Sequence, residues 1–458
     1  MTTIRPDIFR AYDIRGIVGT DLSEAVYEQL GRAAGTLYRN RGSRRIVVGH
    51  DARLTSPSFA AALTRGLQAS GCDVVDIGMV PTPVMYFAVD YLKADGGAVV
   101  TASHNPPEFN GLKMRHYEPT YGGVPFSSDE VQEVGRIAIS NAVTTGQGAY
   151  SRVSVDDAYV EHIAALVTLP RRMKVVVDGG NGVAGPLGVR VFERLGCEVV
   201  PLFIEPDGTF PNHHPDPLKE KNMRDLMRVV RETGAELGIG LDGDGDRLGV
   251  VDDQGTMVFA DRYMIVLAQA ALRHGPAPIV FDVKCSKVLA EAITSFGGTP
   301  VMWKTGYTNQ SAKMRELGAP VAGELSGHVF NNRPGHSFDD GTFAGCCLIE
   351  AIMASGTTLS QALAPFPALA EVPEERIELD DVRKFAAVEY VRGKFAGSHT
   401  IIDTDGLRID FGDGWGLLRA SNTEPVITTR FEAVTEARAA YIRDQLLGAL
   451  REYTNAHA

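Results

Sequence analysis

The sequence predicts an α/β protein made of three similar repeats and a smaller C-terminal α+β domain. The order strand, helix, strand, helix, strand occurs three times before about residue 365, and each round ends in a polar loop. After that point the pattern changes to short strands and one terminal helix. Strands that alternate with helices are typical of largely parallel sheets, in which ligands bind at the carboxyl ends of the strands. The three polar loops are therefore where chemistry is expected.

The first repeat is preceded by a short run and a helix. Ile8 to Gly16 is predicted to form a strand that ends in a glycine turn, and Ser23 to Arg39 a helix with one apolar face. The repeat itself then has, in order, strand Arg45–Asp51, helix Pro57–Ala69, strand Gly71–Ile77, a helix from about Pro83 and strand Gly97–Val100.

The second and third repeats follow the same order. The second has strand Lys174–Asp178, a glycine-rich turn through Gly185, a helix, strand Gly196–Val200, helix Met223–Glu232 and strand Leu237–Leu241. The third has strand Pro278–Asp282, helix Lys287–Phe296, strand Gly297–Met302, helix Gln310–Leu317 and strand Pro320–Ala322. In the C-terminal domain, strands Thr400–Asp403, Leu407–Phe411, Gly416–Arg419 and Val426–Arg430 precede helix Glu436–Tyr453. Residues 143–150 are expected to form the first linker, and Asp252–Gly255 a turn before the third repeat.

Composition excludes several classes of protein. The chain of 458 residues carries a formal charge of −12, which argues against nucleic-acid or anionic-membrane partners, because these require a basic surface. The five cysteines are scattered and lack CxxC spacing, so neither a disulfide framework nor a thiolate zinc site is indicated. No stretch has signal-peptide or membrane-span character, and a cytoplasmic location is expected.

The first polar loop, Thr101-Ala-Ser-His-Asn-Pro106, places Ser103 where a strand breaks into a turn. In isolation such a serine is more often a turn former than a nucleophile. The second loop, Asp242-Gly-Asp-Gly-Asp-Arg247, aims three carboxylates at one hard cation. An EF-hand also begins D-x-D-x-D, but it requires glycine at Arg247 and glutamate at Asp253, so Mg²⁺ is favoured over Ca²⁺ and over a bare acidic turn.

The two remaining loops could hold a phosphosugar. Gly323-Glu-Leu-Ser-Gly-His328 offers Glu324 and Ser326 to sugar hydroxyls, and His328 could move a proton, although a lone loop histidine is more often incidental. Arg419-Ala-Ser-Asn-Thr-Glu-Pro425 combines a guanidinium, hydroxyls and backbone N–H groups, which matches a phosphate dianion as well as it matches an ordinary turn. Together the four loops indicate phosphoryl transfer on a phosphosugar.

In these motifs and their order the chain resembles the α-D-phosphohexomutases, and within them the bacterial phosphomannomutase/phosphoglucomutase group. Ala11-Tyr-Asp-Ile-Arg-Gly16 adds a fifth matching motif, so the resemblance runs nearly end to end. It implies three mixed-sheet α/β domains and a smaller α+β domain around a central cleft. The expected domains are 1–150 (phosphoserine), 151–255 (metal), 256–366 (sugar) and 367–458 (phosphate).

The resemblance also implies roles for individual residues. Ser103 would carry a phosphate, and with Asp242, Asp244 and Asp246 it would bind one Mg²⁺ per chain. Arg247 would steady the transferring group, while Lys113 and His328 would transfer protons. The expected substrate contacts are Tyr12, Arg15, Lys284, Tyr307, Glu324, Ser326, Arg419, Ser421, Asn422 and Thr423. Tyr307 stands where the related enzymes commonly have histidine, and Lys219-Glu-Lys-Asn222 differs from their usual Pro-Glu-Asn.

The implied reaction moves a phosphate between the 1- and 6-positions of mannose or glucose, through phosphoserine and a hexose 1,6-bisphosphate that also acts as activator. The expected partner is this small phosphosugar, with no nucleic acid or membrane, and the expected assembly is a monomer or homodimer. Two alternatives stay open at this stage. One is a phosphoglucosamine mutase, which shares the serine and metal motifs, and the other is a catalytically silent sugar-phosphate sensor.

Overall fold

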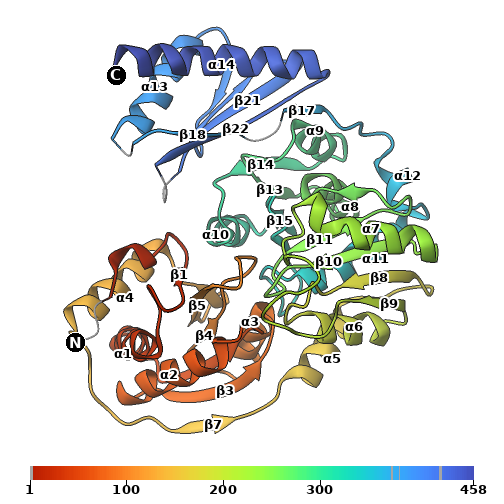
Figure 1. The fold of residues 1–458 in the computed structure, drawn as a ribbon. Helices are drawn as coiled ribbons and strands as arrows, with labels where there is room; N and C mark the ends of the chain where they lie inside the picture. The colour runs from red at the N-terminus through yellow and green to blue at the C-terminus, as the bar shows by residue number, and fades with distance from the viewer. Residues whose placement is uncertain (1–3, 373–374, 381, 422–424, 458) are drawn as a thin grey trace. The chain divides into compact units, whose positions relative to one another are not determined.

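The computed structural model describes residues 4–372, 375–380, 382–421 and 425–457 (Figure 1). The chain forms two compact units. The first unit consists of Met1–Ala270 with Ser326–Ala362, and the second of Ala271–Leu325 with Leu363–Ala458. The chain therefore passes from one unit to the other within the predicted sugar-binding loop, between Leu325 and Ser326.

The first unit begins with a mixed sheet of seven strands in the order β1-β5-β4-β2-β3-β7, with β6 paired to β5. Strands β4, β2, β3 and β7 are parallel, whereas β5 runs antiparallel to β1, β4 and β6. The strands are β1 Ile14–Ile17, β2 Arg45–His50, β3 Asp73–Met79, β4 Gly96–Val100, β5 Phe109–Glu118, β6 Gly122–Pro125 and β7 Tyr150–Arg152. The elements around this sheet are the 3-10 turn Pro6–Ile8, α1 Glu24–Asn40, α2 Ser56–Ala69, α3 Thr82–Tyr91 and α4 Ser128–Ser140.

The helices cover both faces of this sheet, as the side chains of successive strand residues show. Ile46 and Val48 of β2 share one buried cluster with α1, α2 and α4. Gly97 of β4 faces Met85 and Val89 of α3, because successive strand residues point to opposite faces. The sheet is thus covered on both sides, which explains its long apolar strands.

The first unit also contains a second sheet in the order β12-β11-β10-β8-β9, in which β10, β8 and β9 are parallel. Its strands are β8 Lys174–Asp178, β9 Glu198–Leu202, β10 Leu237–Leu241, β11 Leu248–Val251 and β12 Met257–Val258, and β16 Val329–Asn331 belongs to the same unit. The helices of this part are α5 Asp156–Leu166, α6 Gly185–Arg194, α7 Glu220–Thr233, α8 Ala260–Leu272, α11 Gly341–Ser355 and α12 Leu359–Leu363. The second polar loop, Asp242–Arg247, is called the carboxylate loop. It connects β10 to β11, which form an antiparallel hairpin.

The second unit contains a parallel sheet and an antiparallel one. Strands β14 Thr299–Trp303, β13 Pro278–Asp282 and β15 Val321–Gly323 are parallel and are accompanied by α9 Lys287–Ser295 and α10 Tyr307–Leu317. The antiparallel sheet has the order β17-β22-β21-β20-β19, with β18 also paired to β22. Its elements are β17 Ala370–Val372, β18 Arg376–Glu378, β19 Thr400–Ile402, β20 Leu407–Asp410, β21 Gly414–Ala420, β22 Val426–Ala433, α13 Arg383–Phe395 and α14 Glu436–Ala456.

A buried arginine joins the two sheets of the second unit. Arg408 of β20 donates from Nη1 to the carbonyls of Val283 and Cys285, at 2.6 and 2.7 Å, and stacks on Trp415. Burial lowers the pKa of Arg408 to about 10. A buried charge is costly unless it is hydrogen-bonded, so Arg408 needs these two carbonyls. The interaction therefore links the antiparallel sheet to the loop after β13.

The fold class predicted from the sequence is confirmed, and the predicted strands and helices of the three repeats occur within a few residues of their expected positions. The strand predicted for Ile8–Gly16 is wrong over most of its length, because a 3-10 turn and bends precede β1. Several elements were not predicted from the sequence, among them α4, α5, α8, α13, β5 and α11. Helix α11 is apolar on every side and buried, so it has no amphipathic period to recognise. Within the described ranges, none of the helices has the length and apolar character needed to cross a membrane.

Helices α1 and α2 cross at two glycines, which generates a testable prediction. A Cβ on Gly31 would lie 2.3 Å from the carbonyl oxygen of Leu63, and one on Gly66 would lie 2.1 Å from that of Glu28. We expect Gly31→Ala to lower the free energy of unfolding by about 1–3 kcal/mol, the usual effect of overpacking. Chemical denaturation followed by circular dichroism measures this.

The matched control is Gly448→Ala in α14, where an added Cβ meets nothing within 4 Å. There alanine should stabilise the helix by up to about 1 kcal/mol, because it has the higher helix propensity. Equal effects of the two substitutions would contradict the close helix contact.

Candidate active site

Ser103 lies in a backbone conformation that serine seldom adopts. Its φ is +52°, in the left-handed region, directly after β4 ends at Val100. The side chain of Thr101 accepts a hydrogen bond from the Ser103 N–H at 2.9 Å, and the residue is almost fully buried. Non-glycine residues in this region persist only where their surroundings fix them, and they cluster at functional sites.

Arg53 holds the loop that contains Ser103. It is a buried residue between β2 and α2, and its guanidinium has five N–H donors. Its Nε donates to Asp51 at 3.1 Å. The other four bonds, of 2.5–3.0 Å, go to the backbone carbonyls of Ser103, Asn105, Pro106 and Phe109. Every N–H of the guanidinium is therefore used, four of them on the Ser103 loop.

The carboxylate loop approaches Ser103 closely. Asp242, Asp244 and Asp246 have no solvent exposure. A Cβ on Gly243 would lie 2.4 Å from the carbonyl oxygen of Ser103, so only glycine permits this approach. The Ser103 hydroxyl donates to Asp242 Oδ2 at 2.8 Å. The serine and the aspartates, which the sequence placed in separate repeats, thus form one site.

Cationic and hydroxyl groups compensate part of the negative charge. Lys113 of β5 donates from Nζ to Asp244 Oδ2 at 2.7 Å and also to Asp246 Oδ2. Thr82, at the start of α3, donates to Asp244 Oδ2 at 2.6 Å. Burial would raise the pKa of Asp244, but Lys113 and Thr82 hold it below its usual range. Burial and the neighbouring carboxylates raise the pKa of Asp242 well above its usual range.

The donor set fits a divalent cation. One oxygen from each of the three aspartates lies within 4.8 Å of the others. Oδ1 of Asp244 and Oδ1 of Asp246 are buried and have no hydrogen-bond donor. Buried carboxylate oxygens without donors are the hard ligands that Mg²⁺ and Ca²⁺ require, and they are costly to bury without such a partner.

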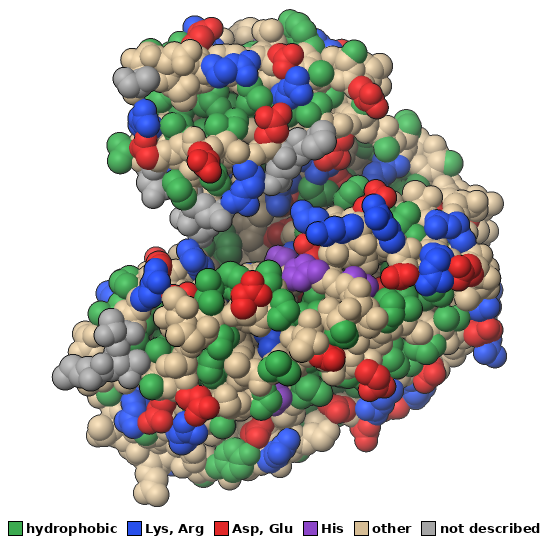
Figure 2. All heavy atoms as spheres, viewed as in Figure 1, with side chains coloured by type: hydrophobic (Ala, Val, Ile, Leu, Met, Phe, Trp, Pro, Cys, Tyr) green, Lys and Arg blue, Asp and Glu red, His purple; other side chains and the backbone are tan. Residues whose placement is uncertain are grey.

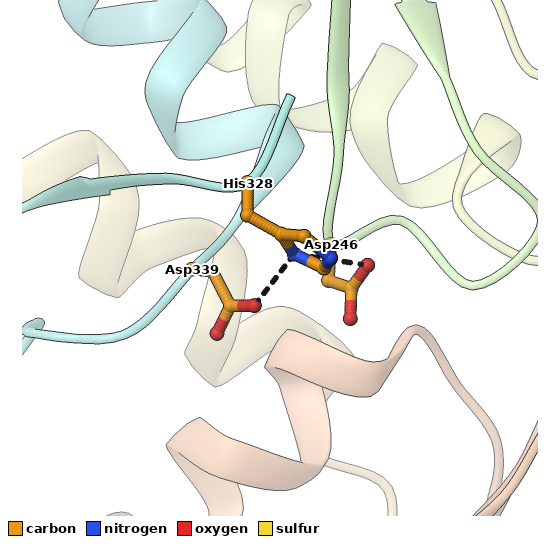
Figure 3. A group of neighbouring side chains, drawn as sticks. All are labelled: Asp246, His328 and Asp339. Carbon is orange, nitrogen blue, oxygen red and sulfur yellow. Dashed lines mark hydrogen bonds and ion pairs between the residues drawn. The ribbon is translucent and has the colours of Figure 1, made fainter. Parts of the chain in front are cut away.

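Arg247 and His328 lie beside this cluster. Their backbones form an antiparallel bridge, and Arg247 Nε donates to His328 Nε2 at 3.0 Å. The backbone N–H of Arg247 donates to Asp242 Oδ1 at 3.2 Å. Figure 3 shows the His328 ring between Asp246 and Asp339, two carboxylates from different segments. The structure therefore groups Lys113, Arg247 and His328 with the serine and the aspartates.

Two residues near Ser103 define the environment of its hydroxyl. Nδ1 of His104 lies 3.2 Å from Ser103 Oγ, and burial together with the charges of Arg247 and Arg15 lowers the pKa of His104 well below its usual range. Arg15 donates to the side chain of Asn105 at 2.7 Å. Of the remaining predicted contacts, Tyr12 and Ser326 also belong to the first unit.

The other predicted substrate residues belong to the second unit. Glu324 is buried and accepts a hydrogen bond from the Gly306 N–H at 2.7 Å, and Arg419 Nε donates to Asp405 at 2.9 Å. Lys284 Nζ lies 3.9 Å from Asp282 Oδ2. Tyr307 is the first residue of α10, and the backbone of Ser421 pairs with Val426. Asn422 and Thr423 lie outside the described residues.

The sequence motifs do not include Arg53, Thr82 or Asp339. Each acts through a contact outside its own segment, with backbone carbonyls or with the side chain of another segment. The local signals are a polar residue after a strand in Gly49-His-Asp-Ala-Arg53 and a polar pair before a helix in Phe338-Asp-Asp340. Such signals are common in ordinary turns.

Four family models cover nearly the whole chain. Models of phosphoglucomutase/phosphomannomutase α/β/α domains I, II and III match residues 6–142, 157–255 and 259–369, and the model of the C-terminal domain matches residues 372–449. The chain belongs to the phosphoglucomutase/phosphomannomutase family. The resemblance inferred from the sequence motifs is confirmed.

Relatives of this phosphohexomutase chain match it over most of their own length. It is 42% identical to the phosphomannomutase/phosphoglucomutase of Pseudomonas aeruginosa, over 95% of this chain and 93% of that protein. It is 39% identical to a phosphoglucomutase of Neisseria meningitidis, over 99% of both chains. A crystal structure of a family member from Burkholderia thailandensis has a TM-score of 0.91 and 42% identity, and covers 99% of this chain and 98% of that one.

Charges of both signs are interspersed over the visible surface of this family member (Figure 2). With a formal charge of −12, the chain offers an anionic ligand little long-range attraction. An anion that binds here must therefore be attracted by cations close to it, and Arg15 and Arg247 of the first unit lie near Ser103. Arg15 donates to Asn105, so its placement depends on how firmly the Ser103 loop is held.

We expect Arg53→Lys to reduce turnover by on the order of 10²-fold, because displacements of about 1 Å in a reacting group have effects of this size. Lysine keeps the charge but has three donors on a flexible stem, so it cannot bond to Asp51 and four carbonyls at once. Steady-state kinetics with a hexose 1-phosphate measures the effect. Arg65→Lys, at an exposed position of α2, is the control and should change little. Near-normal turnover of Arg53→Lys would show that the hydrogen bonds of Arg53 to the Ser103 loop are not needed for activity.

Proposed function

We propose that the chain interconverts the 1- and 6-phosphates of mannose, of glucose or of both, with Ser103 as the group that carries the phosphate. One observation supports this most strongly. Ser103 is buried, and its hydroxyl donates to Asp242 of the carboxylate loop. The names of the relatives, phosphomannomutase and phosphoglucomutase, support the reaction and favour a hexose over glucosamine.

The proposed reaction has two transfers in opposite directions. Phosphoserine 103 first gives its phosphoryl group to the free hydroxyl of a hexose phosphate, at O6 or O1, and the serine oxygen leaves. The product is a hexose 1,6-bisphosphate, which turns around and returns its other phosphate to Ser103. A proton leaves the sugar hydroxyl in the first transfer and returns in the second, so atoms and charge balance.

Residues of the first unit would perform this transfer. Arg247 would neutralise charge on the transferring phosphoryl group. His328 and Lys113 would accept and return the proton of the sugar hydroxyl. A divalent cation, Mg²⁺ by ligand type, would be held by Asp242, Asp244, Asp246 and a Ser103 oxygen, where it would supply electrostatic stabilisation of the phosphoryl group.

Most of the proposed substrate contacts belong to the second unit. Glu324 of this unit and Ser326 of the first unit would hydrogen-bond the sugar 3- and 4-hydroxyls, while Tyr307 and Lys284 would contact the sugar or its phosphate. Arg419, Ser421, Asn422 and Thr423 would hold the phosphate that is not reacting, with Tyr12 and Arg15 added from the first unit. The domains 1–150, 151–255, 256–366 and 367–458 would divide these roles. We further propose a cytoplasmic monomer or homodimer activated by hexose 1,6-bisphosphate.

The first experiment substitutes Ser103 with alanine. Turnover of glucose 1-phosphate or mannose 1-phosphate, with a trace of bisphosphate, should fall by at least about 10³-fold, because no other group can store the phosphate. Intact mass should lose the roughly 80 Da of a phosphate that wild type carries. Ser127→Ala is the control, because it removes the N-cap of α4 and should reduce only stability, by about 1 kcal/mol.

Two outcomes would contradict this proposal. Near-normal turnover of Ser103→Ala would remove Ser103 from its role. A wild-type protein with no phosphate and no turnover would indicate a sugar-phosphate sensor instead. Comparison with glucosamine 1-phosphate tests the remaining alternative.

The second experiment concerns the metal. Asp244→Asn should weaken Mg²⁺ binding by more than the roughly 10–100-fold that supporting residues contribute, and turnover should fall with it. Asp225→Asn, on the exposed side of α7, should change neither. Removal of metal with EDTA followed by titration with Mg²⁺ measures both quantities. Full activity of the chelated enzyme would contradict a metal role.

Binding of Mg²⁺ should also weaken as the pH falls. Burial and the neighbouring carboxylates raise the pKa of Asp242, so protons compete with the cation for this carboxylate at higher pH than for an ordinary aspartate. Affinity should therefore rise with pH until Asp242 is fully ionised.

A further inference from the structure

We propose that Thr82 is a positioning residue that fixes one oxygen of Asp244 and thereby favours Mg²⁺ over Ca²⁺ at the carboxylate loop. This rests on the proposed function, in which Asp244 helps to hold a divalent cation. Thr82 is fully buried at the start of α3, and its hydroxyl donates to Asp244. The different surroundings of the two Asp244 oxygens carry the inference.

The two oxygens of the Asp244 carboxylate differ in their hydrogen bonds. Oδ2 accepts one bond from the Thr82 hydroxyl at 2.6 Å and another from Lys113 Nζ at 2.7 Å. Oδ1 is buried and has no hydrogen-bond donor among the described residues. Because two donors already occupy Oδ2, Oδ1 is the oxygen that Asp244 can offer to a cation. The Thr82 hydroxyl therefore helps to decide which oxygen is offered.

Thr82 is the donor whose bond does not depend on charge. Lys113 Nζ is shared between Asp244 and Asp246, and the proposed reaction assigns a proton transfer to this lysine. A cation bound at the loop would repel the ammonium group of Lys113, whereas a hydroxyl carries no charge to be repelled. Thr82 can therefore hold Oδ2 in place while Lys113 changes its contacts.

The backbone holds Thr82 and Asp244 together. The Thr82 N–H donates to the backbone carbonyl of Asp244 at 2.9 Å. Pro81 and Pro83 flank Thr82, and their rings restrict the chain on both sides of it. Gly245 follows Asp244 with a φ of +79°, and a Cβ there would lie 3.3 Å from the Cβ of Pro81. The start of α3 and the carboxylate loop are thus in close contact, which leaves the hydroxyl and the carboxylate little freedom.

This arrangement suits Mg²⁺ better than Ca²⁺. Mg²⁺ demands near-octahedral geometry, whereas Ca²⁺ accepts flexible geometry and can bind both oxygens of one carboxylate. A carboxylate whose Oδ2 is held by donors offers a single oxygen in a fixed direction. Without the hydroxyl of Thr82, Asp244 could turn and offer both of its oxygens. Removal of this hydroxyl should therefore weaken Mg²⁺ binding more than Ca²⁺ binding.

The test measures binding of both cations to the full chain by titration calorimetry, after treatment with EDTA. Thr82→Val keeps the branched shape but removes the donor. Its Kd for Mg²⁺ should rise by about 10–100-fold, the usual effect of losing a residue that supports a metal ligand. Its Kd for Ca²⁺ should rise by less than about threefold, because Ca²⁺ tolerates a turned carboxylate. Thr82→Ser retains the hydroxyl and should bind both cations as wild type does.

A matched control separates this effect from a loss of stability. Thr36 of α1 is also buried, and its hydroxyl donates to the carbonyl of Arg32 at 2.7 Å. Thr36→Val should lower the melting temperature and leave both Kd values unchanged. If circular dichroism shows that Thr82→Val does not fold, Thr82→Ala removes the same donor with a smaller side chain and is measured instead.

Several outcomes would overturn the proposal. They are an unchanged Mg²⁺ affinity in the variant without the hydroxyl, an equal loss of affinity for both cations, a loss in Thr82→Ser as large as in Thr82→Val, or a wild type that binds neither cation. Failure of the proposed mutase function is distinguishable from these, because it appears as wild-type protein that binds Mg²⁺ without hexose phosphate turnover. The calorimetric comparison does not depend on turnover.

Discussion

The concentration of three carboxylates in one buried hairpin is the constraint on which the rest of the site depends. Asp242, Asp244 and Asp246 occupy alternate positions and have no solvent exposure. Two like charges about 4 Å apart repel by about 4 kcal/mol at the effective dielectric constant of a protein surface, and by more where water is excluded. The hairpin can hold this charge only if other segments bring donors or cations to it. Ser103, Thr82 and Lys113 come from three such segments.

The same constraint accounts for the conformation of the serine loop. To reach Asp242, Ser103 must leave β4 in a left-handed turn, which is unfavourable for a residue with a Cβ. Arg53 offsets this with four bonds to backbone carbonyls, and Gly243 removes the side chain that would block the approach. Ser103, the proposed phosphate carrier, is thus positioned by a buried cation whose N–H donors are all used within the protein.

The sequence predicted the parts of the molecule whose signal is local. Parallel strands are short apolar runs between helices, and Ser103 and the three aspartates follow such runs directly, so both could be found. Strand β5 was missed because its residues, from Phe109 to Glu118, mix apolar and charged side chains. The turn near Ile8 was predicted as a strand because its residues favour β structure. In the folded protein, tertiary packing outweighs that preference. Arg53 could not be identified, because most of its partners are backbone carbonyls far along the chain. Asp339 could not be identified, because its contact with His328 depends on how two neighbouring segments fold together.

The residues proposed for phosphate transfer and those proposed for substrate binding fall mostly on opposite sides of the boundary between the two compact units. Ser103, the carboxylates, Arg247, His328 and Asp339 all belong to the first unit, so the proposed transfer of phosphate and proton needs no residue from the second. Glu324, Tyr307 and Arg419, proposed to hold the sugar and its distal phosphate, belong to the second unit. The chain crosses between them at Leu325, only three residues before His328. In the proposed reaction a bisphosphate turns around and would have to release residues of the second unit. The bonds that hold Ser103 and His328 lie wholly within the first unit, so this release would not disturb them.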